Sequence, residues 1–180
     1  ARQEGWRVSV GAAVLAGKEW TGSSEDRLLV VPDLDVRYGD RFFASFGTGI
    51  GVNLLQSDGF RAGALVRPNF GREEEDDRAG LRGMGDIDFA AEPGVFAEVT
   101  TGPLQAGVEL RQALGGHEGL LAEARLDYRL RLGQVGISFG PRVRYGDDTH
   151  TQAFYGVSAA QAVRAGLPSY RPEGGIQTIG

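Results

Sequence analysis

Apolar and polar residues alternate with a period of two along most of the chain, in runs of about ten residues. In the run 120–132, one phase is apolar and includes Leu126 and Leu130, whereas the other phase carries Glu123, Arg125 and Arg129. This alternation is typical of antiparallel strands whose two faces meet different surroundings. The pattern predicts an all-β fold, specifically an antiparallel up-and-down transmembrane β-barrel.

The runs predict nine complete strands and the beginning of a tenth. The nine runs are 6–16, 28–38, 42–54, 60–70, 92–100, 104–111, 120–132, 135–145 and 151–157. Ser158 is a predicted N-cap for a short helix through Ala165 that stops at Gly166, and 174–180 read as the opening of another strand. Bacterial single-chain barrels have an even number of strands. We therefore expect residues 1–180 to form a single barrel domain that lacks its C-terminal closing strands, from a complete barrel of about 12 strands.

Composition narrows the classes of function. The chain has 29 glycines among 180 residues, a share that few helical proteins tolerate, and no cysteine, which excludes disulfides and thiolate chemistry. The net charge of −5 leaves no basic surface for nucleic acid, so we expect no nucleic-acid partner. The chain starts at Ala1 without a charged and then apolar leader, so export to the outer membrane is inferred from the fold.

The two phases predict which face meets lipid. Aromatic residues of the apolar phase gather towards the ends of runs, among them Trp6, Tyr38 and Phe70, as in the aromatic girdles of membrane barrels. The polar phase carries both signs of charge in neighbouring runs, which suits ion pairing across a narrow lumen. We expect lipid outside and a charged ladder inside, formed by Asp33, Asp35, Arg37, Arg61, Arg67, Glu98, Glu109, Arg111, Glu123, Arg125, Asp127, Arg129, Arg142 and Arg144.

Two alternatives remain open for this pattern. A soluble lipocalin-like barrel has the same period with the opposite polarity, so that its apolar phase lines the interior. The charged ladder, in turn, either plugs the barrel or lines a passage that attracts small anionic solutes or ligands.

The sequence offers little support for catalysis or metal binding. His117 and His150 fall in predicted loops without a second ligand at metal spacing, which favours solvated histidines and no metal site. No serine occupies a nucleophile elbow. We expect no enzyme activity, no catalytic residue and no cofactor.

An acidic run interrupts the alternation after residue 70. It consists of Glu73, Glu74, Glu75, Asp76 and Asp77. Because the run lacks the ordered spacing of a calcium loop, it is most simply a solvated loop. It is also a candidate docking loop for a basic partner.

Several segments, taken in order, resemble one family. They are Gly22-Ser23-Ser24-Glu25-Asp26-Arg27 with Pro32, Tyr38-Gly39-Asp40-Arg41-Phe42-Phe43, Gly49-Ile50-Gly51-Val52-Asn53-Leu54, Leu81-Arg82-Gly83-Met84-Gly85-Asp86, and Tyr155-Gly156-Val157-Ser158-Ala159-Ala160-Gln161-Ala162 followed by Gly166-Leu167-Pro168 and Tyr170. Together they resemble the MltA-interacting protein (MipA/OmpV) family of Gram-negative outer-membrane proteins. The resemblance implies a barrel in the outer-membrane lipid and, for some members, a scaffold that links a lytic transglycosylase to a murein synthase in cell-wall (peptidoglycan) metabolism.

Overall fold

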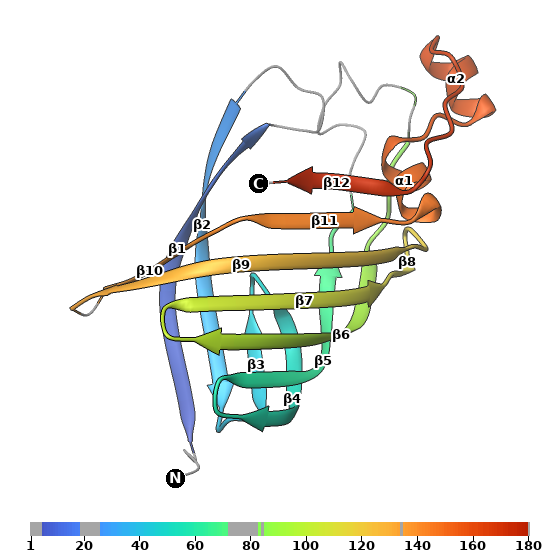
Figure 1. Ribbon diagram of the computed structural model, residues 1–180. Coiled ribbons are helices and arrows are strands. Elements are labelled where there is room, and N and C mark those ends of the chain that lie inside the picture. The colour runs from blue at the N-terminus through green and yellow to red at the C-terminus, as the bar shows by residue number, and fades with distance from the viewer. Residues whose placement is uncertain (1–4, 19–25, 72–82, 84, 134, 180) are drawn as a thin grey trace. The chain divides into compact units, whose positions relative to one another are not determined.

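The computed structural model describes residues 5–18, 26–71, 83, 85–133 and 135–179 (Figure 1). It divides into two compact units, Ala1–Asn53 and Leu54–Gly180. The strands of the described residues are β1 (Trp6–Lys18), β2 (Asp26–Tyr38), β3 (Phe42–Ser45), β4 (Gly49–Ser57), β5 (Phe60–Asn69), β6 (Ala90–Thr101), β7 (Leu104–Gln112), β8 (Leu114–Gly115), β9 (Leu120–Leu132), β10 (Val135–Phe139), β11 (Arg142–Gly146) and β12 (Gly175–Ile179). The predicted all-β antiparallel fold class is confirmed.

In the first unit the strands pair in the order β1-β2-β3-β4. The ladder of β1 and β2 runs without a break from the pair Trp6 and Tyr38 to the pair Lys18 and Asp26. The prediction of one strand over 42–54 is wrong, because the chain turns between β3 and β4, which pair with each other. Ser45 Oγ accepts a hydrogen bond from the backbone N–H of Thr48 at 3.1 Å, and this contact stabilises the turn.

In the second unit the order is β5-β6-β7-β9-β11-β12, with β8 beside β6 and β10 beside β9. The strands predicted over 92–100 and 104–111 are confirmed as β6 and β7. They pair as an antiparallel hairpin, and Gly102 takes the positive φ of 56° that its turn requires. The single strand predicted over 135–145 is wrong, because it divides into β10 and β11. Both pieces pair with β9, and the carbonyl of Pro141 between them accepts from Leu126 N at 3.0 Å.

The strand predicted over 151–157 is also wrong, because helix α1 (Asp148–Tyr155) occupies this segment. The Asp147 side chain accepts a hydrogen bond from the backbone N–H of His150 at 2.9 Å and so caps the helix. The predicted helix after Ser158 is confirmed as α2 (Ala159–Ala165), with a capping box at Ser158 and a left-handed Gly166 at its end. The predicted last strand is confirmed as β12. Neither helix in the described part of the chain is long and apolar enough to cross a membrane.

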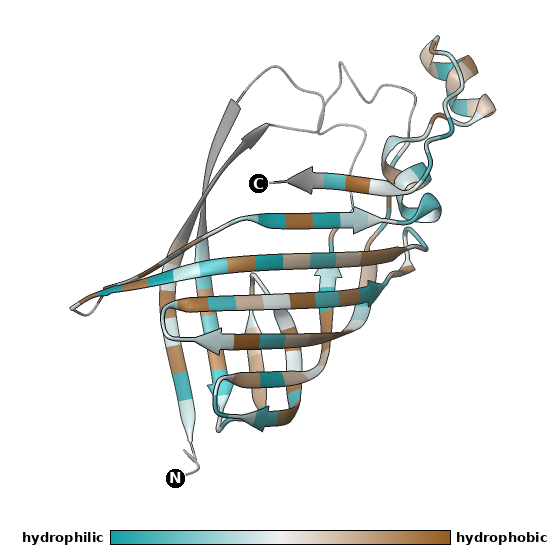
Figure 2. Cartoon of the chain, viewed as in Figure 1, coloured by the Kyte–Doolittle hydropathy of each residue, from teal (hydrophilic) through white to brown (hydrophobic). Residues whose placement is uncertain are grey.

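The apolar phase of the strands is largely exposed and the polar phase is largely buried, which is the reverse of most soluble proteins. Bands of apolar and polar residues alternate along the strands (Figure 2). Leu126 of the apolar phase is 44% exposed, whereas Glu98 and Glu123 of the polar phase are buried. The few large apolar residues on the polar phase, including Phe43, Leu65 and Leu121, are buried as well. The buried interior therefore lies on the charged side of the strands, where the ionised groups must find partners.

Candidate functional site

The polar phases of β5, β6, β7, β9 and β11 form two groups of ion pairs in the second unit, which together are called the network. Its members are Arg61, Arg67, Glu92, Glu98, Glu109, Arg111, Glu123, Arg125, Arg142 and Arg144. Because adjacent strands place residues of the same phase side by side, the antiparallel register sets which charges meet.

The first part of the network spans four strands in a single row. Arg61 is opposite Glu98, Glu98 is opposite Gly107, and Gly107 is opposite Arg125. The Arg61 guanidinium binds both carboxylate oxygens of Glu98, at 2.7 and 3.0 Å. Arg125 Nη2 reaches the same carboxylate at 2.5 Å. A Cβ on Gly107 would lie 3.0 Å from Arg125 Nε, so the missing side chain leaves room for Arg125 to cross β7.

The second part of the network joins two glutamates that face each other directly. Glu109 on β7 is opposite Glu123 on β9, an unfavourable pair of like charges. Arg111 lies between them, with Nε 3.1 Å from Glu109 and Nη2 3.7 Å from Glu123. Arg67 approaches Glu109 at 2.9 Å, and Arg144 approaches Glu123 at 3.0 Å. The arginines thus offset the repulsion between the two carboxylates.

Glu92, near the start of β6, lies at one end of the network. It is 1% exposed and forms a buried ion pair with Arg111. Asn69 Nδ2 donates a hydrogen bond to Glu92 Oε1 at 2.8 Å, and His117 Nε2 lies 3.4 Å from the same oxygen. Glu92 therefore links the arginines of the strands to a histidine.

His117 and His150 meet at this end of the network. Their Nδ1 atoms are 3.2 Å apart, and the Phe154 ring packs against both imidazoles. The two histidines are 3% and 6% exposed, so the prediction that they are solvated loop residues is wrong. Burial, reinforced by His117, lowers the pKa of His150 to about 4. No group of three or more potential ligand side chains in the described ranges is placed to hold a metal ion.

The residues of the predicted charged ladder lie in different parts of the structure. The network takes up those from β5 to β11 except Arg129, which is exposed. Asp127 joins the edge of its first part through an ion pair of 3.8 Å with Arg125. Asp33, Asp35 and Arg37 lie in the first unit, where Arg37 Nε donates to Asp35 at 2.7 Å. The acidic run 73–77, the candidate docking loop, lies outside the described residues.

The site residues predicted from the sequence do not include four polar residues that the structure places here. Glu92 shares the phase of Glu98, and Asn69 shares that of Arg67, so the alternation could have indicated both. His117 and His150 are 33 positions apart in the chain, and neither belongs to a strand. Local pattern carries no signal for their contact.

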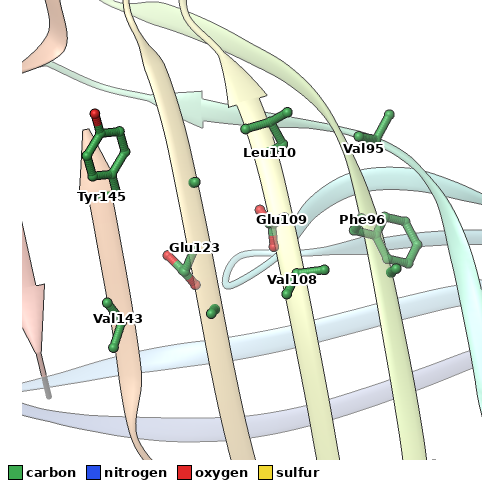
Figure 3. A pocket seen from close by; sticks show the side chains of 11 residues that line it. Val95, Phe96, Val108, Glu109, Leu110, Glu123, Val143 and Tyr145 are labelled. Atoms are coloured by element: carbon green, nitrogen blue, oxygen red, sulfur yellow. The ribbon is translucent and has the colours of Figure 1, made fainter. Parts of the chain in front are cut away.

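The opposite face of these strands has a hollow of about 460 Å³ (Figure 3). Its lining comes mostly from the apolar phase of β6, β7, β9 and β11, and includes Val95, Leu110, Ala122 and Tyr145. Small side chains in the middle and larger ones around them explain its shape. Nearly all of its surface is apolar, which suits hydrocarbon contact better than chemistry.

Comparison with known proteins identifies the family. Residues 10–180 match the family model described as MltA-interacting protein MipA. Searches of curated proteins and of solved structures found no match. The match covers nearly the whole chain, and it agrees with the order of motifs in the sequence. This chain belongs to the MltA-interacting protein MipA family.

Proposed function

We propose that this protein is an outer-membrane β-barrel that acts as a non-enzymatic scaffold for murein-hydrolysing and murein-synthesising enzymes. The observation that carries the proposal is membership of a family described by its interaction with MltA. In this proposal the apolar phase of the strands faces lipid, and the ion-pair network faces the lumen.

The distribution of burial supports the membrane placement. A water-soluble barrel would gain stability by burying Leu126, Val108 and their neighbours, yet these side chains are exposed while Glu98 is buried. Hydrocarbon around the apolar phase would remove the cost of this arrangement. A lipocalin-like binder requires the opposite polarity.

The pairing of the network supports a scaffold rather than a hydrolase or an anion passage. Arg61 and Arg125 share Glu98, and three arginines surround Glu123. Carboxylates held as acceptors by arginines are poor general acids, and arginines neutralised by glutamates attract anionic solutes weakly. The hollow on the outer face is lined almost entirely by apolar surface.

Two measurements test the proposal in order. Fractionation of cell envelopes should place the protein in the outer membrane, and extraction should require detergent. The full-length protein, refolded in detergent micelles, should then bind the purified MltA lytic transglycosylase of the same organism in biolayer interferometry. A matched control is an unrelated outer-membrane barrel of similar size. Equal binding to both barrels would reject the scaffold role but leave the membrane placement standing.

The acidic run gives a sharper test of where the partner docks. Neutralising Glu73, Glu74, Glu75, Asp76 and Asp77 to the corresponding amides should weaken binding of a basic partner surface. Asp58→Asn combined with Glu118→Gln removes two exposed acidic charges elsewhere and should leave binding unchanged.

Planar-bilayer recordings should show no steady current, whereas an anion-selective current would favour a transport barrel.

A further inference from the structure

The two histidines form a contact that has room for only one proton between its two nitrogen atoms. His117 Nδ1 and His150 Nδ1 are 3.2 Å apart, so one must donate and the other accept. Asn69 Nδ2 lies 3.1 Å from His117 Nε2 and donates to it when His117 is neutral. His117 then carries its proton on Nδ1 and donates to His150, which accepts.

A first added proton preserves this contact. When His117 is protonated, its Nε2–H points towards Glu92 Oε1 at 3.4 Å, and its Nδ1–H still donates to His150. A second proton, on His150 Nδ1, has the opposite effect. Two N–H groups, both on cationic rings, then face each other at hydrogen-bond distance, and the contact becomes repulsive.

The groups around His150 oppose each other in their effect on that second proton. The carboxylates of Glu92 on β6 and Asp147 before α1 favour it, whereas His117 and Arg144 on β11 disfavour it. Arg111 on β7 neutralises Glu92, and Glu123 on β9 neutralises Arg144. Burial is the largest cause that disfavours the second proton, and with His117 and Arg144 it lowers the pKa of His150 to about 4.

The two histidines are closely packed between the segment before β9 and helix α1. A Cβ on Gly119 would lie 2.5 Å from His150 Cβ, and Phe154 contacts both rings. Beyond α1, helix α2 has no buried residues. In the described chain, the buried residues of α1 are His150 and Thr151. Thr151 bonds to Gly146 and Gln177 of the flanking strands at 3.4 Å, so the histidine contact is what holds α1 on the side of His117.

We propose that His117 and His150 form an acid-sensitive latch, which holds α1 against the Glu92 end of the sheet, with α2 following from α1, and opens when both imidazoles carry a proton. The latch is closed at neutral and mildly acidic pH, and it releases residues 148–174 while the strands stay paired. This device does not depend on the scaffold role and is tested without any partner enzyme.

Spin labels can follow the latch directly, because the chain has no native cysteine. One pair of labels, on Leu104→Cys and Val163→Cys, joins β7 to α2, and a reference pair, on Leu104→Cys and Leu110→Cys, stays within β7. All three sites are exposed. In detergent micelles, the first pair should give a narrow distance distribution at pH 7 and a broad one below about pH 4, the pKa of His150. The change should reverse on neutralisation, and the reference pair should stay narrow throughout.

Three variants separate the latch from general acid damage. His150→Gln keeps an acceptor but cannot take a charge, so the distribution should stay narrow in acid. Gly119→Ala forces the backbone away from His150 and should broaden it already at pH 7. Arg164→Gln, on exposed α2, should behave like the parent protein. The proposal fails if His150→Gln opens over the same pH range as the parent, if the parent stays narrow at pH 3.5, or if the reference pair broadens together with α2.

A measurement on the unmodified protein guards against variants that do not fold. The chain has two histidines, so selective ¹⁵N-histidine labelling gives a spectrum of four ring nitrogens. We expect one imidazole to remain neutral at pH 5, with a hydrogen-bonded Nδ1. Independent titration of both rings near pH 6.5, the ordinary histidine value, would overturn the latch.

Discussion

The two units of this protein carry charge on the same phase of their strands but use it differently. In the first unit, Arg7 pairs with Asp40 at 3.3 Å, and their side chains are 50% and 36% exposed. In the second unit, Glu92 and Arg111 are both almost fully buried, and each has further polar partners. The difference shows that alternation alone does not make the charged residues of a face stabilise the fold. Burial and shared partners do.

Strand register explains much of this contrast. In the β1–β2 ladder Arg7 lies directly opposite Arg37, so each arginine turns to a carboxylate elsewhere. In the second unit Arg61 lies opposite Glu98, and this pair recruits Arg125 from two strands away. The like pair Glu109 and Glu123 is bridged by Arg111, whereas Arg7 and Arg37 turn to different carboxylates.

Removing the Glu92 charge should give the largest effect. Glu92→Gln leaves Arg111 buried with one fewer anion, and we expect it to lower the free energy of unfolding by about 3 to 5 kcal/mol. Urea unfolding of the protein in detergent micelles, followed by circular dichroism, measures the loss. Combining Glu92→Met with Arg111→Met removes both charges and should recover part of it. A loss below about 1 kcal/mol would mean that burial does not distinguish the two units.

Acid should weaken the second unit through His150 in particular, since both histidines lie there. The folded pKa of about 4 is below the ordinary value of 6.5, so the unfolded chain binds a proton that the folded chain does not. Stability from this residue is complete above about pH 6.5 and falls as the pH drops towards 4, by at most about 3 kcal/mol. Unfolding measured at several pH values should show a shallower slope for His150→Gln. Identical slopes would contradict the assignment.

Glu98→Gln should cost less than Glu92→Gln, because its arginine partners are partly exposed. Arg61 and Arg125 would lose charge-assisted hydrogen bonds but could turn towards water. We expect a loss of about 2 to 3 kcal/mol in the same urea assay. Asp35→Asn in β2 is the matched change in the first unit, where the partner Arg37 is half-buried, and should cost less than about 1 kcal/mol. Equal losses would remove the distinction between shared and isolated carboxylates.

The sequence predicted the strands better than their interruptions, for a physical reason. Phe42, Ala44 and Ile50 keep one parity across the turn between β3 and β4, so a period of two does not reveal it. The same holds at the break before β11, where the ladder on β9 continues. The segment of α1 also alternates, but by chance. It forms a helix, which the Asp147 side chain caps.

The candidate site was predictable in its residue types but not in its connections. Alternation placed Glu98, Glu109 and Arg125 on one phase. Glu98 and Arg125 do meet in the first part of the network, and Glu109 lies in the second. Which arginine meets which glutamate depends on register across several strands, and that information is not local in the sequence. The histidine contact depends on the path of two connections, so it could not be foreseen.

The smallest loss of unfolding free energy should come from breaking the exposed ion pair of the first unit. Arg7→Gln removes the contact with Asp40 and a hydrogen bond from Arg7 Nη2 to the Gly39 carbonyl at 3.2 Å. Water can replace both, so we expect a loss of no more than about 0.5 kcal/mol, which should shrink further as salt is added. Urea unfolding at low and high salt measures it. A salt-independent loss as large as that of Glu98→Gln would show that the first unit also depends on its charges. Burial would then no longer explain the difference between the units.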